Sequence, residues 1–230
     1  MVAKGFTQVY GTDFEETFSP VAWFETICIL LALAALEDWY IESLDVKTAY
    51  LYGNLDKGVY MGQPEGYMKK GQERKVCHLL KSLYRLKQSA LQWNKELHKS
   101  LLTLGFTRTR SDAGVYYKFE GTNIIVVIIY VDDVLFMGSN PKLMKKEKGH
   151  FMKVWECRDL GEAKEYLGMR ITHDCKIRTL TLDQCVYAEK SLNDSGCKTP
   201  NRCGHCCQWV ITQKSLKLRQ PQTYVPDTNR

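Results

Sequence analysis

The chain has 230 residues, of which 44% are apolar and 25% are charged. These values are ordinary for a folded globular chain, and they exclude a wholly disordered protein, a collagen-like repeat and a small disulfide scaffold. The net charge of +6 says little about the main body, because residues 197–230 carry six Lys and Arg against a single Asp.

The first half of the chain predicts two helices and two strands. Ile27–Leu36 is apolar on every side and follows Glu25-Thr26, which is typical of a buried helix that begins near Thr26. Tyr40–Asp45 alternates in the manner of a strand, and Val76–Leu80 is a candidate short strand. Ala90–Leu104 carries a stripe of leucines and is followed by Gly105, so we expect a helix that this glycine ends.

The second half predicts a strand-rich region. Val115–Phe119, Ile124–Val131 and Val134–Met137 are candidate strands, and the β-branched residues of the second predict burial on both faces. Further predicted elements are a basic helix at Lys142–His150, a hairpin formed by Lys164–Ile171 and Ile177–Asp183, and a last helix at Gln184–Leu192. Together these elements predict an α+β fold, in which an antiparallel sheet carries helices packed on one side.

The composition changes near residue 194. We therefore expect one domain over residues 1–194 and a divergent, basic, Cys-containing tail over residues 195–230 that is poorly ordered. Cys203-Gly-His-Cys206 has the residue types of zinc ligands, but a single CxxC without a second pair does not favour a structural zinc site.

Cellular location is constrained by three features of the sequence. The odd number of cysteines, nine, indicates reduced thiols and an intracellular, cytoplasmic protein. No apolar core follows the N-terminal residues, so no secretion signal is expected. The longest apolar runs are far shorter than the ~20 residues of a membrane-spanning helix, so no contact with a membrane is expected.

Two adjacent acids, Asp132 and Asp133, interrupt the most apolar part of the chain. They lie between two predicted buried strands, with no Lys or Arg between Asn123 and Asn140. Like charges resist joint ionisation and an unpaired carboxylate is costly to bury, so a divalent metal such as Mg²⁺ is the natural compensating charge. A solvent-facing turn remains the alternative interpretation, because Asp is a favoured turn residue.

Asp45 adds a third carboxylate at the end of another strand. Three carboxylates from two strand ends can hold a pair of metal ions about 3.5–4 Å apart, as in polymerases and nucleases.

Several blocks of residues carry a resemblance to a known family. Leu44-Asp-Val-Lys-Thr-Ala-Tyr-Leu51 together with Tyr130-Val-Asp-Asp133 resembles the reverse transcriptase of copia-type LTR retrotransposons. Further blocks agree in the same order, including Thr17-Phe-Ser-Pro-Val21, Gln63-Pro-Glu-Gly66, Lys81-Ser-Leu-Tyr84 and Asp159-Leu-Gly-Glu162. The resemblance extends from about Val2 to about Asp194.

The resemblance implies a polymerase palm with part of the fingers, and RNA- or DNA-templated DNA synthesis. It implies Asp45 and Asp132 as the main Mg²⁺ ligands (Mn²⁺ could replace Mg²⁺) and Asp133 as the third carboxylate. It places Tyr50 at an aromatic steric gate that excludes ribonucleotides, and Gln88 near the incoming nucleotide. Lys4 is the one cation left near the triphosphate. The implied partners are a template-primer, a dNTP, and the integrase and RNase H domains of a parent Pol polyprotein.

Three departures from the family pattern leave the activity open. The chain begins well inside the family's fingers region, so about the first fifth of that domain is expected to be absent. Arg85 stands where the family has Gly, and Ser89-Ala-Leu91 replaces Ala-Pro-Arg. Arg85 would cost about 1 kcal/mol if that glycine has positive φ. The alternatives to an active reverse transcriptase are a catalytically inactive remnant that at most binds nucleic acid, and a metal-dependent nuclease.

Overall fold

The computed structural model describes residues 2–174, 178–185, 187 and 208–212. The helices of this part are α1 (Phe24–Leu36), α2 (Ser89–Thr103) and α3 (Pro141–Val154). The largest sheet has the antiparallel strand order β4 (Thr107–Arg108), β5 (Val115–Glu120), β6 (Asn123–Tyr130), β7 (Asp133–Gly138), β1 (Tyr40–Val46) and β8 (Cys157–Glu162). The predicted mixed α/β class with antiparallel strands is confirmed.

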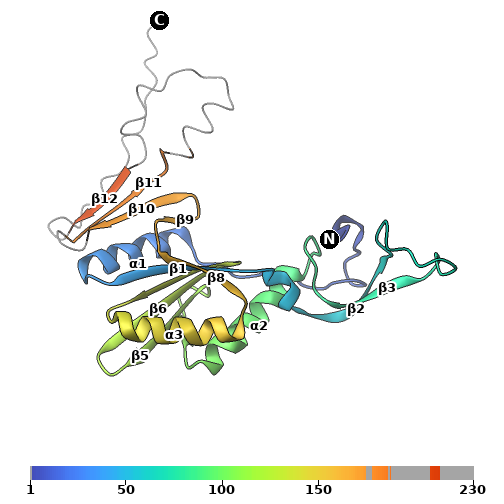
Figure 1. Ribbon diagram of the computed structural model, residues 1–230, viewed down its shortest axis with the longest axis horizontal. Coiled ribbons are helices and arrows are strands. Elements are labelled where there is room, and N and C mark those ends of the chain that lie inside the picture. Colours follow the sequence, from blue (N-terminus) through green and yellow to red (C-terminus); the bar gives the residue numbers. More distant parts are fainter. Residues whose placement is uncertain (1, 175–177, 186, 188–207, 213–230) are drawn as a thin grey trace, which may run out of the picture.

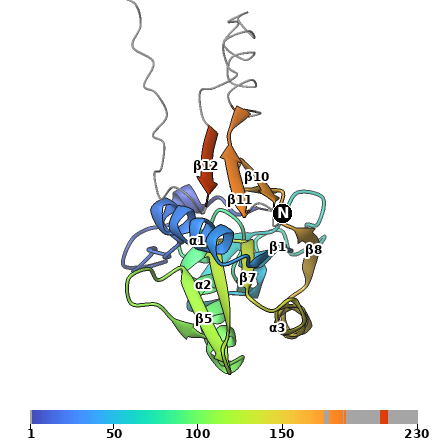
Figure 2. The ribbon, with the colours of Figure 1, turned by 90° about the vertical axis from the view of Figure 1, so that its left-hand side faces the viewer.

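Two smaller sheets accompany the large one. β12 (Gln208–Thr212), β11 (Thr179–Asp183), β10 (Met169–Asp174) and β9 (Glu165–Tyr166) form an antiparallel sheet, which lies on the α1 side of the large sheet (Figure 2). β2 (Asn54–Gly62) and β3 (Val76–Lys81) form a separate hairpin that extends away from the large sheet (Figure 1).

The expectation that helices pack on one side of the sheet is wrong. Helix α1 packs on one face through Ile27 and Leu31, in a cluster with Leu135 of β7. Helices α2 and α3 pack on the opposite face, where α2 residue Leu97 joins a cluster with Phe136, the next residue of β7 (Figure 1). The reason is that β6 and β7 are apolar on both faces, and each face needs a cover that keeps it from water.

The helix predictions are confirmed with small shifts at their ends. α1 begins at Phe24, two residues before the predicted start, because Asp112 accepts a hydrogen bond from the backbone N–H of its N-cap residue, Trp23, at 2.8 Å. α2 is followed by Gly105 at φ +84°, as predicted. The backbone N–H groups of Gly105 and Phe106 donate to the carbonyls of the last turn, which satisfies the end of the helix.

The sequence predictions miss β2, β8, β12 and the two-residue strand β4. β2 covers residues where turn signals dominate the sequence, and its partner β3 lies more than ten residues further along. β8 reads Cys-Arg-Asp-Leu-Gly-Glu and has little apolar content, yet it pairs with β1 as the edge strand of the large sheet. Edge strands tolerate charged residues, so their sequences carry a weak strand signal.

The predictions for the C-terminal part of the chain are confirmed only in part. Gln208–Thr212, inside the expected irregular tail, forms β12 and pairs with β11 along its whole length, so this part of the tail is a strand. β10 and β11 confirm the predicted hairpin, although β9 and β10 share the range expected for its first strand. Most of the helix predicted at Gln184–Leu192 and the cluster at Cys203–Cys207 lie outside the described residues.

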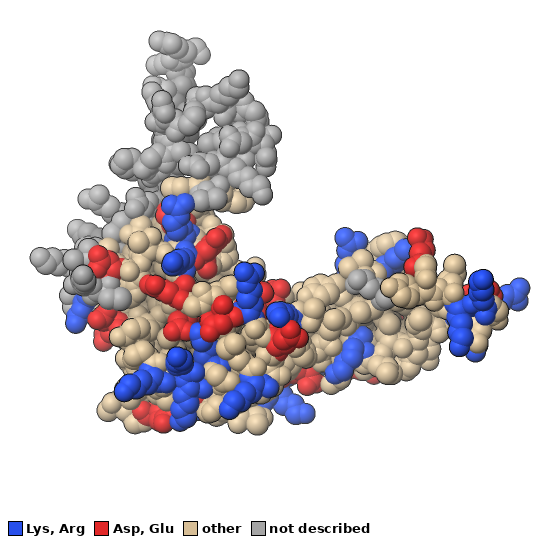
Figure 3. All heavy atoms as spheres, in the orientation of Figure 1, with Lys and Arg blue, Asp and Glu red and all other residues tan. Residues whose placement is uncertain are grey.

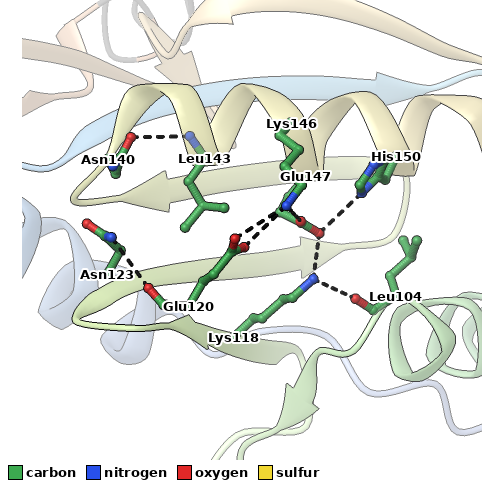
Figure 4. Close-up of polar contacts among 9 residues, drawn as sticks. All are labelled: Leu104, Lys118, Glu120, Asn123, Asn140, Leu143, Lys146, Glu147 and His150. Atoms are coloured by element: carbon green, nitrogen blue, oxygen red, sulfur yellow. Dashed lines mark hydrogen bonds and ion pairs between the residues drawn. The ribbon is translucent and has the colours of Figure 1, made fainter.

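A buried carboxylate ties α3 to the sheet. Glu147 is 1% exposed and accepts a hydrogen bond from Lys118 Nζ of β5 at 2.8 Å. Lys118 Nζ also donates to the carbonyl of Leu104 at 2.9 Å, while Lys146 and His150 approach Glu147 from α3 itself (Figure 4). This network links α3, β5 and the end of α2 into one unit on the face opposite α1.

Candidate active site

The site lies where β1 ends beside the bend between β6 and β7. Asp45 pairs directly with Asp133, and Tyr130 pairs with Asp133 across the bend. Directly opposed residues of antiparallel strands project from the same face, with Cβ atoms about 4.5–5.5 Å apart. Val131 and Asp132 are the two residues of the bend, so the chain brings three half-buried carboxylates to one edge of the sheet.

The bend has a strained backbone that several contacts hold. Val131 has φ +59°, a conformation that β-branched residues rarely adopt and that costs about 1–3 kcal/mol. The buried indole of Trp93 in α2 donates to the carbonyl oxygen of Val131 at 2.7 Å. The backbone N–H of Val46 donates to the carbonyl oxygen of Asp132 at 2.9 Å. The core and β1 therefore both fix the position of the two adjacent acids.

Negative charge gathers at the three carboxylates. Among the described residues none of them makes an ion pair. Burial is the largest cause of the rise in the pKa of Asp133 from 3.8 to about 6, and the charges of Asp132 and Asp45 contribute to that rise. At neutral pH the cluster is thus an unbalanced concentration of negative charge.

Neighbouring acids respond to the same charge. Burial, followed by the charges of Asp132 and Asp45, raises the pKa of Tyr84. Burial and then the charge of Asp45 contribute to a pKa of about 12 for Cys157. The pKa of Tyr166 is also raised, by burial and then by Asp133, and its buried hydroxyl has no hydrogen-bond partner in the described structure.

The donor set suits a divalent cation. Carboxylate oxygens are the ligands that Mg²⁺ and Mn²⁺ prefer, and a cation here would offset the negative potential that raises these pKa values. In the described part of the chain, no three His, Cys, Asp or Glu side chains already form a metal-holding group. The carboxylate oxygens therefore suit a metal ion chemically, although the three side chains are not positioned as a ready-made metal site.

Tyr50 lies beside the carboxylates. It belongs to the short 3-10 turn Ala49–Tyr52 (η2) that follows β1, and its ring contacts that of Tyr84 with centroids 4.8 Å apart. Its pKa is raised by burial first and then by the charge of Asp132. The turn after Asp45 thus returns an aromatic side chain to the site.

Gln88 and Lys4 are placed differently. Gln88 is 4% exposed, and its amide accepts from Gln8 at 3.0 Å and donates to the carbonyl of Asp13 at 3.0 Å. These contacts anchor the N-terminal segment against the start of α2. Lys4 is exposed and lines a cavity of about 590 Å³ between that segment and the β2–β3 hairpin, which none of the three aspartates lines.

Three residues at the site were not predicted from the sequence. Tyr84 comes from the chain between β3 and α2, and Trp93 is a buried residue of α2. Arg158 of β8 pairs with Asp45 on the side of β1 away from Asp133, so an exposed cation lies next to the carboxylates. The unpredicted strand β8 brings Arg158 here, and no local pattern could have placed it.

Comparisons with known proteins assign the chain to a family. A family model described as reverse transcriptase (RNA-dependent DNA polymerase) matches residues 1–207. The Retrovirus-related Pol polyprotein from transposon TNT 1-94 of Nicotiana tabacum is 43% identical over 84% of the chain, and that from transposon RE1 of Arabidopsis thaliana is 39% identical over 74%. The putative transposon Ty5-1 protein of Saccharomyces cerevisiae is 31% identical over 68% of the chain.

The relatives are longer than this chain. The matched part spans 14% of the Nicotiana tabacum polyprotein, 12% of the Arabidopsis thaliana polyprotein and 50% of the yeast protein. No solved structure matches the chain.

Proposed function

The chain belongs to the reverse transcriptase family of copia-type transposons, and from this we propose that it carries the nucleotidyl-transfer site of an RNA-directed DNA polymerase. The observation that supports the proposal most directly is the pairing of Asp45 with Asp133 next to Asp132, while none of the three forms an ion pair with a described residue. A half-buried group of like charges is costly unless it serves a cation or a substrate.

In this proposal Asp45, Asp132 and Asp133 hold two divalent metal ions. When bound there, Mg²⁺ or Mn²⁺ would acidify a primer 3′-hydroxyl and neutralise a dNTP triphosphate. The 3′-oxygen would attack the α-phosphorus, and pyrophosphate would leave on the opposite side. The strained bend at Val131 sets the position of Asp132 and Asp133 before the substrate arrives.

Other residues would position the nucleotide. Tyr50, packed on Tyr84 and close to Asp132, would press against the sugar and reject a 2′-hydroxyl. Arg158, next to Asp45 in register, would supply positive charge to the phosphates. Lys4 and Gln88 would act less directly, since Gln88 holds the N-terminal segment through Gln8 and Asp13.

The fold is divided as follows in the proposal. The six-stranded sheet with its helices is the palm, and the β2–β3 hairpin with the N-terminal segment is part of the fingers. Residues 1–194 form the reverse transcriptase domain, and residues 195–230 follow it, with β12 paired to β11 of that domain. The chain would act within a Pol polyprotein that also holds integrase and RNase H, in the cytoplasmic particle of the element, on a template-primer and dNTPs.

One observation favours the alternative of an inactive remnant. Arg85 occupies a position with φ +72°, where the family pattern has glycine, and the side chain strains the segment that carries Tyr84. Backbone strain beside the site is more easily tolerated in a chain that no longer needs polymerase activity than in an efficient polymerase.

Primer extension distinguishes these possibilities. We expect incorporation of dNTPs on a primed RNA template with Mg²⁺ or Mn²⁺, and its loss by a factor of about 10³ or more in Asp132→Asn. Asp56→Asn, a surface change far from the bend in sequence, is the matched control and should retain activity. Template binding without incorporation, unchanged by Asp132→Asn, would identify a remnant; nucleotide release from a duplex without dNTPs would identify a nuclease.

A further inference from the structure

The paired acids of the site lie on the α1 face of the large sheet. Side chains alternate between the two faces along a strand. Leu135 and Met137 of β7 belong to the cluster that packs under α1, and Asp133 is two residues before Leu135, so Asp133 lies on the same face. Asp45 stands in the same relation to Ile41 of β1, which is in that cluster too. Both acids therefore face the side on which the sheet of β9 to β12 lies (Figure 2).

Tyr166 of β9 lies in the layer that covers this face. Its side chain packs in the same cluster as Ile41 and Leu135, and the residue is 4% exposed. Its hydroxyl is fully buried and has no hydrogen-bond partner among the described residues. Burial and then the charges of Asp133 and Tyr130 raise the pKa of Tyr166, so the phenol is close enough to Asp133 to respond to its charge. A buried donor thus lies near the half-buried carboxylate, between the two sheets.

The backbone around Tyr166 leaves its ring little freedom. β9 and β10 are joined by a two-residue turn, in which Leu167 has φ +51° and Gly168 has φ +75°. Positive φ at both positions is typical of a type I′ hairpin, and leucine rarely adopts it. Tyr166 pairs with Met169 across the turn, and Met169 is itself buried in the cluster. The turn and the core together fix where the hydroxyl lies.

The unpartnered hydroxyl of Tyr166 calls for an explanation. Phenylalanine would fill the same space without a polar group, and a buried polar group without a hydrogen bond is costly. A phenol is protonated at neutral pH and can donate one hydrogen bond. Asp133 is an acceptor on the facing strand, and it forms no ion pair with a described residue. The donor and the acceptor on this face are therefore matched in their chemistry.

We propose that Tyr166 is a positioning residue for Asp133. Its hydroxyl donates a hydrogen bond to one oxygen of the Asp133 carboxylate when the site holds a divalent cation, which leaves the other oxygen to the cation. Carboxylates that bind metals are commonly held in this way by a neighbouring donor. Such hydrogen bonds are often long in ligand-free enzymes and shorten when the site is filled. The inference rests on the proposed function, because it takes Asp133 as a metal ligand.

Tyr116 offers a matched comparison. It is 1% exposed and belongs to the cluster on the opposite face of the sheet, and its hydroxyl is hydrogen-bonded to His98 Nδ1 at 3.0 Å. Tyr116→Phe therefore breaks an existing hydrogen bond, whereas Tyr166→Phe removes only an unpartnered group. Without metal, Tyr116→Phe should unfold at a lower urea concentration than the wild type, and Tyr166→Phe should not.

The test measures the binding of Mn²⁺ alone to the full chain, without nucleotide or nucleic acid. Free Mn²⁺ is followed by electron paramagnetic resonance during a titration at pH 7.5. Acidic side chains are also spread among the Lys and Arg side chains of the surface (Figure 3), so only binding that Asp133→Ala weakens is assigned to the site. Tyr166→Phe should raise the Kd of that binding about 10-fold, since loss of a hydrogen-bond partner of a metal ligand typically costs about 10- to 100-fold in affinity. Tyr116→Phe should leave this Kd unchanged.

A double variant tests whether the hydroxyl acts through Asp133. In Asp133→Ala the proposed acceptor is gone, so the addition of Tyr166→Phe should raise the Kd for Mn²⁺ no further. Non-additivity of this kind is expected of two residues that act through one contact. Losses of affinity that multiply in the double variant would show that Tyr166 acts elsewhere, and they would overturn the proposal.

The remaining outcomes separate this inference from the polymerase proposal. An unchanged Kd in Tyr166→Phe, together with weaker binding in Asp133→Ala, overturns the inference and leaves the metal site intact. A loss of stability in metal-free Tyr166→Phe as large as that of Tyr116→Phe also overturns it, because the hydroxyl would then serve the fold. A raised Kd in Tyr166→Phe without any dNTP incorporation by the wild type supports the inference and counts against the polymerase. Mn²⁺ binding that Asp133→Ala leaves unchanged overturns both.

Discussion

The charge cluster at the bend predicts an unusual response to Asp133→Asn. The pKa of Asp133 is raised from 3.8 to about 6, so the folded protein holds this proton more tightly than the unfolded chain does. The resulting stabilisation is fully present below about pH 4 and is lost as the pH rises through about 6. Asp133→Asn, which removes the charge, should therefore match the wild type at pH 4 and be more stable at pH 7.5.

The size of the effect follows from the shift. A difference of about two pKa units is about 3 kcal/mol as an upper limit, and because Asp133 is half-exposed we discount it to about 1–2 kcal/mol. This corresponds to a rise in Tm of about 2–8 °C at pH 7.5 in a domain of this size. The measurement is thermal unfolding of both proteins between pH 4 and pH 8, without metal.

Asp56→Asn is a control with the opposite sign. Hydrogen bonds from Lys95 and Gln92 lower the pKa of Asp56, so its contribution to the stability of the fold is present at neutral pH and is lost on acidification.

Millimolar Mg²⁺ at pH 7.5 should stabilise the wild type more than Asp133→Asn, since ligand that binds the folded state raises its stability. A difference between wild type and Asp133→Asn that is constant from pH 4 to pH 8 would refute the electrostatic reasoning.

Three further changes test the surroundings of the site. Arg85→Gly should raise the free energy of unfolding, measured in urea, by about 1 kcal/mol, because glycine accepts φ +72° without strain. Arg85→Ala keeps the strain, so an equal rise in the free energy of unfolding of that variant would contradict this explanation. Glu147→Gln should lower the free energy of unfolding by about 1–3 kcal/mol, since it breaks a buried ion pair with Lys118. In the same denaturant titration, Glu120→Gln, which breaks the half-exposed pair with Lys146, should change the free energy of unfolding by less than about 0.5 kcal/mol. Trp93→Phe should remove the hydrogen bond to the Val131 carbonyl and slow dNTP incorporation at saturating substrate; an unchanged rate would show that the bend needs no support from α2.

No helix within the described ranges is long and apolar enough to cross a membrane. This agrees with the short apolar runs of the sequence.

Local sequence patterns were sufficient to predict the central strands and the helices. β6 and β7 were predicted within one residue at each end, and α2 likewise, because their apolar residues repeat with the period of the element they form. The acids at the bend were recognisable for a related reason: their charge interrupts an apolar run, and only a specific use offsets that cost. The resemblance then supplied roles for Tyr50 and Gln88, which the residues alone did not, and it supported the metal role already inferred for Asp45.

The sequence by itself determined the central strands of the large sheet and the carboxylates that interrupt them. The tertiary structure decided what those segments meet: that helices cover both faces, that β8 brings Arg158 to Asp45, and that Gln88 holds Gln8 and Asp13. These contacts join residues far apart in the chain, through backbone pairing and long-range packing. The choice of strand partner cannot be predicted from the local sequence pattern, because the hydrogen bonds between strands are made by backbone atoms that every residue has.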